Sequence, residues 1–380
     1  GTRRRTGLAD MASATAAAGA GASPVRLRPF KRVAVVGGTH GNETTGVYAL
    51  RRFQKHPELL ARDGIDVEYC LANPKAVREV RRFVDDDLNR QYSMARLRDD
   101  SLESYESVRA KLIEQRFGPK DSDRPHADFL VDMHTTTSRM GITMIFESQG
   151  VDPAALYVAK EVRRMLAGRT SAPVFILFAD LERDGIPHTP SIARSGVAIE
   201  VGPVAQGLLR SDACEWMEQA ALAVMDAIAR LNTGEATASE AEAVPVFQNS
   251  RVKVPCPAGE DGSPLAVFHE RLQDGDYRPL RKGDPIFRGL DGEVIEYDGR
   301  LGDTVFPVFV NEAAYYLPES GLGFALCHHA TLPLPPIVTA EDGAARLSLP
   351  VPPADDAEAV AAAIEASDPW EAAEAAAATA

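Results

Sequence analysis

Four residues of types that bind zinc or move protons lie beside short apolar segments. His40 and Glu43 are three residues apart, so a tight loop or one helical turn can aim both side chains at one point. His134 directly follows one apolar segment, and Glu200 lies inside another. Two histidines and one carboxylate suit Zn²⁺ and leave a coordination position for water. The pattern predicts a catalytic zinc site with Glu200 as the general base.

Each of these residues also has a purely structural interpretation. His40 and Glu43 could be an ordinary surface pair, and His134 could bond to backbone at a strand end. Glu200 could pair with an arginine, because a buried carboxylate without a partner is costly. Asp132 lies two residues before His134 and is well placed to orient that histidine from behind a metal.

A basic stretch supplies candidate carboxylate-binding groups. Arg82 precedes the run Asp87-Leu88-Asn89-Arg90. A planar guanidinium binds a carboxylate through two parallel hydrogen bonds, and an Asn–Arg pair offers neutral and charged donors side by side. The alternative interpretation is a solvated basic surface.

The elements that must position these residues alternate along the chain. Ligands gather beyond the carboxyl ends of strands in α/β sheets, where His134 is expected. Alternating strands and helices predict an α/β layered domain over residues 30–232. Strands are expected at residues 32–36, 66–71, 128–133, 142–146, 173–178 and 197–201, and helices at 43–53, 104–117 and 214–231. After a polar linker at 233–243, short strands and turn signals predict a smaller, mostly β domain over 244–332.

Both chain ends are expected to lie outside the folded domains. Residues 1–29 are rich in Ala, Gly and Arg and poor in acids, which is typical of a disordered extension or a targeting segment. Residues 333–380 are rich in Pro, Ala and acids, which predicts a disordered tail with at most a transient helix over 357–366.

The composition narrows the possible partners. A net charge of −14 argues against nucleic acid, because phosphate binding needs a basic surface. No apolar run reaches the roughly 20 residues needed to cross a bilayer, so no membrane partner is expected. The four scattered cysteines fit a reducing compartment. We therefore expect a cytoplasmic protein, or an organellar one if residues 1–29 are a transit peptide.

Ordered blocks between Val33 and Tyr316 resemble one hydrolase family. They include VVGGTHGNETTGV, DDLNR, DMHTTTSRMG, IEVGP, QGLLR and FPVFVNEAAYY. Together they are similar to the aspartoacylase and aminoacylase-3 branch of the zinc carboxypeptidase-like hydrolases. The resemblance implies an α/β/α domain with a mixed central sheet, and a C-terminal mostly β domain that partly caps the pocket.

The resemblance also implies catalytic roles. His40, Glu43 and His134 would hold one Zn²⁺ per chain, Glu200 would be the general acid and base, and Arg82 would stabilise the oxyanion. The implied reaction removes the acyl group, most simply acetyl, from a small N-acylated amino acid and yields a carboxylate and a free amino acid.

Substrate contacts and assembly follow from the same resemblance. Asn89, Arg90 and Tyr315 would bind the substrate's carboxylate, and Gln206 would support the site. A homodimer is compatible with the family, although the sequence shows no interface signal of its own.

Three positions depart from the family pattern. Pro190 stands where the aspartate-selective members carry an arginine for the substrate's side-chain carboxylate, and Ile186 stands where they carry a tyrosine. Thr135 stands where the branch commonly has an asparagine. These changes predict weak selection for N-acetylaspartate. The alternative is then an aminoacylase-3-like deacylase of neutral or aromatic N-acyl amino acids. Less favoured alternatives are a zinc carboxypeptidase and a non-catalytic metal-binding protein. Cations that could replace the missing arginine are Arg183, His188 and Arg194.

Overall fold

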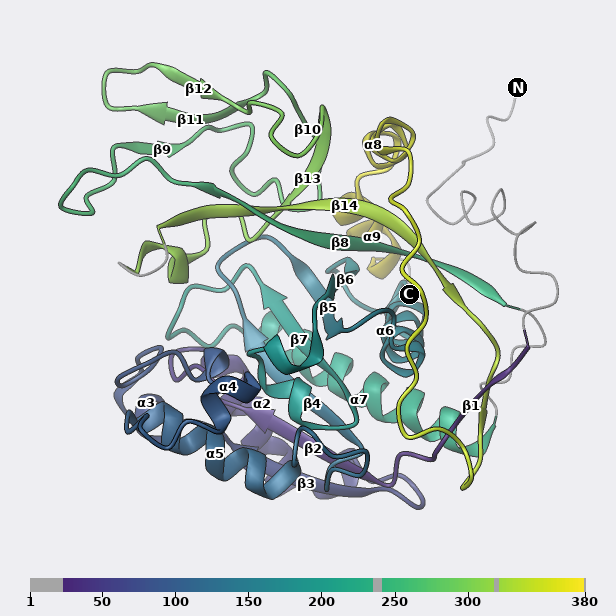
Figure 1. The fold of residues 1–380 in the computed structure, drawn as a ribbon. Coiled ribbons are helices and arrows are strands. Elements are labelled where there is room, and N and C mark those ends of the chain that lie inside the picture. The colour runs from purple at the N-terminus through teal and green to yellow at the C-terminus, as the bar shows by residue number, and fades with distance from the viewer. Residues whose placement is uncertain (1–22, 235–240, 318–320, 379–380) are drawn as a thin grey trace, which may run out of the picture.

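The computed structural model describes residues 23–234, 241–317 and 321–378. A ten-stranded mixed sheet runs through the described chain in the order β10-β13-β14-β8-β6-β5-β7-β4-β2-β3, with helices packed against it (Figure 1). No helix of the described residues is long and apolar enough to cross a membrane.

One half of this sheet carries the predicted site. Its parallel strands are β2 (Arg32–Gly37), β3 (Asp66–Leu71), β4 (Phe129–Thr135) and β7 (Ser195–Gly202). Strand β5 (Gly141–Ser148) is antiparallel to β7, and β6 (Val174–Asp180) is parallel to β5. The helices are α2 (Thr44–Lys55), α3 (Pro74–Glu79), α4 (Met94–Leu97), α5 (Tyr105–Phe117), α6 (Pro153–Leu166) and α7 (Ser211–Thr233).

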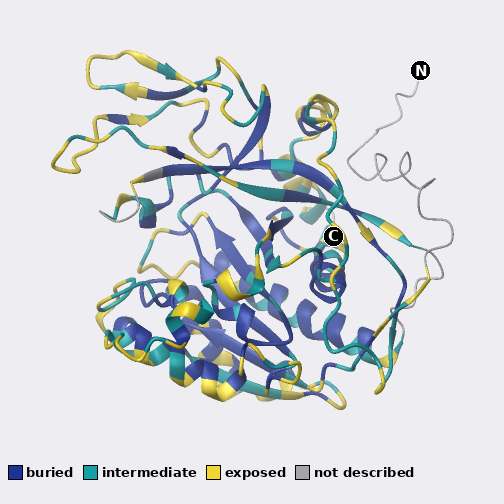
Figure 2. Ribbon diagram, in the orientation of Figure 1, coloured by how far each residue is buried: buried dark blue, intermediate teal, exposed yellow. Residues whose placement is uncertain are grey.

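Strand β2 shows why the sheet is covered on both faces. Side chains alternate along a strand, and Val33 and Val35 belong to a core shared with α2, α6 and α7. Ala34 and Val36 point into a second core shared with α5. Both sets are buried, and Figure 2 shows the buried residues concentrated on the central strands. The predicted α/β/α arrangement with a mixed sheet is confirmed.

The C-terminal region is mostly β, as predicted, but it is continuous with the central sheet. Strand β8 (Glu242–Pro255) pairs with β6 through Leu177 and Phe247, and β14 (Leu322–Leu334) pairs along β8. The remaining strands are β9 (Ala266–Phe268), β10 (Leu280–Arg281), β11 (Pro285–Gly289), β12 (Val294–Glu296) and β13 (Thr304–Val308). The expected linker at 233–243 is described only in part, since residues 235–240 lie outside the described residues and Glu242 already begins β8.

The structure differs from the expectation of a disordered tail. Strand β15 (Ile337–Thr339) pairs in parallel with β1 (Val25–Leu27), and helices α8 (Ala357–Ala366) and α9 (Pro369–Ala377) follow. The physical reason is that the tail buries apolar side chains: Val360 and Ile364 join the core beneath β13 and β14, and Trp370 contacts Trp216 of α7. Residues 25–27 form strand β1, although they were expected to belong to the disordered N-terminal extension. Residues 1–22 of that extension lie outside the described residues.

Candidate active site

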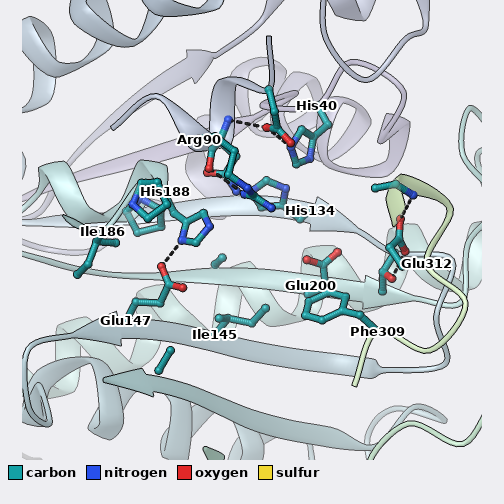
Figure 3. A pocket seen from close by; sticks show the side chains of 18 of the residues that line it. His40, Arg90, His134, Ile145, Glu147, Ile186, His188, Glu200, Phe309 and Glu312 are labelled. Atoms are coloured by element: carbon teal, nitrogen blue, oxygen red, sulfur yellow. Dashed lines mark hydrogen bonds and ion pairs between the residues drawn. The ribbon is translucent and has the colours of Figure 1, made fainter. Parts of the chain in front are cut away.

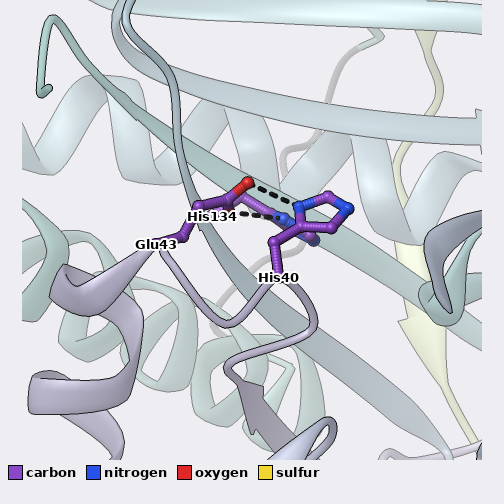
Figure 4. Close-up of side chains that lie close together, drawn as sticks. All are labelled: His40, Glu43 and His134. Atoms are coloured by element: carbon purple, nitrogen blue, oxygen red, sulfur yellow. Dashed lines mark hydrogen bonds and ion pairs between the residues drawn. The ribbon is translucent and has the colours of Figure 1, made fainter. Parts of the chain in front are cut away.

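The carboxyl ends of β2 and β4 bring the predicted zinc ligands together (Figure 4). His40 lies in the loop after β2, Glu43 directly precedes α2, and His134 lies near the end of β4. His40 Nδ1 is 2.5 Å from Glu43 Oε1, and His134 Nδ1 is 3.0 Å from Glu43 Oε2. One ligand atom from each residue lies within 4.8 Å of the others, and all three residues are buried. Two imidazole nitrogens and a carboxylate converging in this way fit Zn²⁺.

The loop that carries His40 is fixed by a close backbone approach. A Cβ atom at Gly41 would lie 2.3 Å from the carbonyl oxygen of Ala76 in α3, so only glycine fits there. The N–H of Gly41 also donates to the carbonyl of Arg82 at 3.1 Å. The loop that carries His40 and the loop that carries Arg82 are therefore joined by a backbone hydrogen bond.

An aspartate lies behind each histidine. His40 Nε2 is 3.0 Å from Asp87 Oδ1, and His134 Nε2 is 2.9 Å from Asp132 Oδ2, although the second contact is not aligned as a hydrogen bond. Thr39 Oγ1 donates to Asp132 at 2.9 Å. A carboxylate in this position fixes the imidazole orientation that turns Nδ1 toward a metal. Asp132 lies where the sequence predicted such a group, whereas Asp87 was given no role.

The two glutamates of the site have opposite pKa shifts. Burial would raise the pKa of Glu43, but His40 and His134 lower it well below its usual value. Burial and the nearby Glu43 carboxylate raise the pKa of Glu200 well above its usual value. Glu200 is the direct strand partner of His134 across β4 and β7, so the two side chains share one face of the sheet. Glu43 is suited to hold a cation, and Glu200 is suited to accept a proton.

Arg82 lies beside the predicted zinc ligands, with its side chain 13% exposed. Its Nη1 donates to Glu43 Oε1 at 3.3 Å, and its Nη2 donates to Asp87 Oδ2 at 3.0 Å. Burial would lower the pKa of Arg82, but Asp87 and Glu43 raise it. A positive charge is therefore held next to the His40, Glu43 and His134 cluster.

Hydrogen-bond donors remain free on the residues that are predicted to bind the substrate's carboxylate. Asn89 Oδ1 accepts hydrogen bonds from the N–H and Oγ1 of Thr189 at 3.1 and 3.2 Å, which leaves its amide nitrogen to donate. Arg90 Nη1 donates to the carbonyl of Asn89 at 2.9 Å. The hydroxyl of Tyr315 has no hydrogen-bond partner among the described residues, and burial raises its pKa.

Gln206 connects the site to the β region without lining the pocket. Its Oε1 accepts from Asn42 Nδ2 at 2.6 Å, and its Nε2 donates to Glu312 Oε1 at 3.4 Å. Glu312 lines the pocket and accepts hydrogen bonds from Thr136 and Thr137 in the loop after His134. Gln206 therefore supports the site indirectly, and Glu312 is a site residue that the sequence analysis did not assign.

A cavity of about 790 Å³ contains the site (Figure 3). Its wall includes every predicted site residue except Gln206, namely His40, Glu43, Arg82, Asn89, Arg90, His134, Glu200 and Tyr315. Asp87 and Glu312 also line it. Both lie within the quoted blocks DDLNR and FPVFVNEAAYY, so a carboxylate inside such a block was the available signal.

The three positions that depart from the family pattern all lie on the pocket wall, namely Pro190, Ile186 and Thr135. Of the cations that could replace the missing arginine, only His188 lines the pocket, and its Nδ1 contacts the Glu147 carboxylate (Figure 3).

Arg183 and Arg194 do not reach the pocket. Arg183 donates to the carbonyls of Lys120, Ser191 and Ala193, and Arg194 donates to those of Arg28 and Pro29. Neither arginine lines the active-site pocket. Neither of these two arginines therefore takes the place of the missing arginine, although Arg251 and Lys253 do line the pocket.

Sequence comparisons agree with this geometry. A family model for the succinylglutamate desuccinylase/aspartoacylase catalytic domain matches residues 29–228, and one for the AstE/AspA barrel-sandwich hybrid domain matches residues 257–328. Rat aspartoacylase is 39% identical over 77% of this chain and 92% of its own length. The human N-acyl-aromatic-L-amino acid amidohydrolase (carboxylate-forming) is 37% identical over 82% of this chain and 95% of its own length.

Solved structures give the same result. Murine aminoacylase 3 superposes with a TM-score of 0.75 at 33% identity, covering 82% of this chain and 99% of that chain. Succinylglutamate desuccinylase from Vibrio cholerae shares the fold, with a TM-score of 0.53 at 15% identity over 80% of this chain and 82% of that one. The tail after residue 328 lies beyond both family models. With its His40, Glu43 and His134 cluster, its mixed sheet and both matched domains, this chain belongs to the succinylglutamate desuccinylase/aspartoacylase family.

Proposed function

We propose that this protein is a zinc-dependent hydrolase that removes the acyl group from small N-acyl amino acids. The observation that carries the proposal is one pocket that combines the His40, Glu43 and His134 cluster with a proton-accepting Glu200 and donors for a carboxylate. The relatives named aspartoacylase and N-acyl-aromatic-L-amino acid amidohydrolase support the same reaction class. The cytoplasmic location and the homodimer stay predictions from the sequence.

The chain's own residues would divide the chemistry between them. When bound at the cluster, Zn²⁺ supplies an acidified water and polarises the scissile carbonyl. Glu200 takes the proton of the attacking water and returns it to the departing nitrogen. Arg82 donates to the carbonyl oxygen as negative charge develops there. Asp87 keeps both His40 and Arg82 in place for these steps.

The carboxylate of the substrate would be bound by a second set of side chains, different from those that act on the amide. Asn89 offers its amide nitrogen, Arg90 offers a guanidinium, and Tyr315 offers a hydroxyl without a partner among the described residues. These donors fix the distance from carboxylate to scissile carbonyl, which suits a single N-acylated amino acid. A cavity of about 790 Å³ is of the size that takes a small molecule.

We propose further that neutral side chains are preferred over acidic ones. Pro190 offers no charge for a second carboxylate, and Glu147 adds a negative charge to the same wall. His188 is engaged by Glu147 and is not free to bind an anion. These contacts favour a substrate such as N-acetylmethionine or N-acetyltyrosine over N-acetylaspartate.

Amine release by zinc-loaded protein tests both parts. We expect hydrolysis of N-acetyltyrosine and N-acetylmethionine, weaker hydrolysis of N-acetylaspartate, loss of all activity on chelation, and recovery when zinc is returned. Preference for N-acetylaspartate would overturn the side-chain assignment alone. Release of C-terminal residues from peptides without deacylation would overturn the reaction class.

A further inference from the structure

A second cavity, of about 310 Å³, lies between the catalytic domain and the C-terminal tail. It shares a single lining residue, Ile186, with the active-site pocket. Tail residues 345–348 form one wall, and paired backbone hydrogen bonds of 2.9 Å between Val151 and Leu349 hold that wall in place. The tail, which lies beyond both family models, therefore forms one wall of a cavity whose other walls belong mostly to the catalytic domain.

Three arginines line this cavity: Arg183, Arg194 and Arg346. Their hydrogen bonds go to backbone carbonyls, which accept but carry no net charge. Arg346 donates to the carbonyls of Ala193 and Arg194 at 3.3 Å, and also to that of Ser122. Arg194 donates to two carbonyls of the N-terminal segment at 2.8 and 2.7 Å.

The wall of this cavity carries three arginines and a single carboxylate. Arg183 and Arg346 form no ion pair with any described residue, and Arg194 reaches Asp128 Oδ1 only at 3.5 Å. Asp152 is the carboxylate on the cavity wall, and Ser195 Oγ and the first turn of α6 already donate to it at 2.6 and 2.9 Å. The other acids nearby are Asp121, Asp123 and Asp184, none of them paired with these arginines.

Several donors at the cavity have no partner. Arg194 Nε is buried and makes no hydrogen bond, and Nε and Nη1 of Arg183 have no partner among the described residues. The first turn of the 14-residue helix α6 also lines the cavity through Ala154, and a helix N-terminus favours negative charge. Buried charges are normally paired, so unpaired donors and excess positive charge indicate a missing anion.

We propose that this cavity binds a small, multiply charged oxyanion of the carboxylate or phosphate type. Guanidinium groups bind both kinds of anion through paired hydrogen bonds, and the volume suits a molecule of a few non-hydrogen atoms. The arginines come from three segments, and one of them is the tail. Binding would therefore join the tail to the catalytic domain, and it does not depend on the proposed catalytic function.

The test is a calorimetric titration of the zinc-loaded full chain with inorganic phosphate and, separately, with malonate. Ionic strength is held constant with sodium chloride. The key variant is Arg346→Gln, and the matched control is Arg26→Gln, because Arg26 forms an exposed pair with Asp342 in the same region. A third variant, Arg90→Gln, removes the cation through which an anion could bind in the active site instead.

We expect saturable binding of at least one anion to the wild type, unchanged in Arg26→Gln and Arg90→Gln. Arg346→Gln should weaken it roughly tenfold or more, as expected for loss of a charge-assisted contact. Arg183→Gln should give the same loss, which guards against a folding defect in one variant. The proposal is overturned if neither anion binds beyond chloride, if both cavity variants bind as tightly as the wild type, or if Arg90→Gln alone abolishes binding.

Discussion

Replacing Glu147 by Gln should shift the substrate preference toward acidic side chains. Glu147 lines the pocket, as does Pro190, and its carboxylate engages His188. The substitution keeps the size of the side chain, removes its negative charge and frees the imidazole. The freed imidazole of His188 can then interact with a substrate carboxylate.

The size of the effect follows from the charges involved. Two unit charges about 4 Å apart interact by about 4 kcal/mol at an effective dielectric constant of 20. The side chains of His188 and Glu147 are 25% and 17% exposed, so solvent screens part of this interaction. A gain of roughly 1–2 kcal/mol, or about tenfold in relative kcat/KM, is expected for N-acetylaspartate over N-acetylmethionine.

The assay compares kcat/KM for both substrates at one fixed pH. Using the ratio cancels any effect of pH on the chemical step that both substrates share. The control variant is Glu215→Gln, which changes the charge equally on the exposed surface of α7. A ratio that is the same in Glu147→Gln, Glu215→Gln and the wild type would refute the assignment of this wall to the substrate side chain.

Three further predictions concern the metal site, the β region and the tail. Asp87→Asn should weaken zinc binding by about 10- to 100-fold, because His40 loses the carboxylate behind it; competition with a chelator measures this, and unchanged affinity would contradict it. Burial raises the pKa of Asp276 from 3.8 to about 7, so the folded chain keeps a proton that the unfolded chain releases, and wild-type stability is lost as the pH rises from about 4 to 7. The Asp276→Asn variant has no such proton to lose. The difference in unfolding free energy between variant and wild type, measured by urea denaturation, should therefore shift in favour of the variant by up to about 4 kcal/mol between pH 4 and 8. Parallel pH profiles for the two proteins would contradict this prediction. Trp370→Ala should cost about 3 kcal/mol by removing the contact with Trp216, which would lower the thermal midpoint; an unchanged midpoint would show that α9 does not pack there.

The catalytic half of the fold was predictable because its strands are short apolar runs buried on both faces. In such a sheet, residues that follow neighbouring parallel strands meet at one edge. His40 and Glu43 follow β2, and His134 lies near the end of β4, so their convergence could be inferred before any distance was known. Glu200 stood out because a carboxylate inside an apolar strand needs a reason to be there.

Other features carry no such signal. The contact of Glu147 with His188 joins residues 41 positions apart and depends on the path of the loop between β6 and β7, which has no periodicity. Helix α6 was not predicted, although Asp152 accepts from the first N–H groups of that helix as an N-terminal cap. The short strands and turn signals after residue 243 also suggested a separate β domain. In the structure β8 pairs with β6 and joins this region to the central sheet, and such pairing of strands far apart in sequence leaves no local signal.

The tail was expected to be disordered because its average composition is polar and rich in alanine. An average of this kind does not show the few residues that pack against the rest of the protein. Alanine and acidic residues dominate residues 357–377, and they hide three apolar side chains with specific partners. Val360 and Ile364 lie four residues apart, on one face of α8, and both are buried in a core shared with β13 and β14. Trp370 packs between Trp216 and the guanidinium of Arg139. A few well-placed apolar groups are enough to order a segment whose average composition is typical of disorder.

The most direct test of the proposed mechanism is Glu200→Gln in zinc-loaded protein. Zinc content and amine release from N-acetyltyrosine are measured on the same sample. Because Glu200 is assigned to proton transfer and not to metal binding, we predict that one zinc per chain is retained while turnover falls by about 1,000-fold. Zinc retained with turnover near the wild-type value would contradict the central claim.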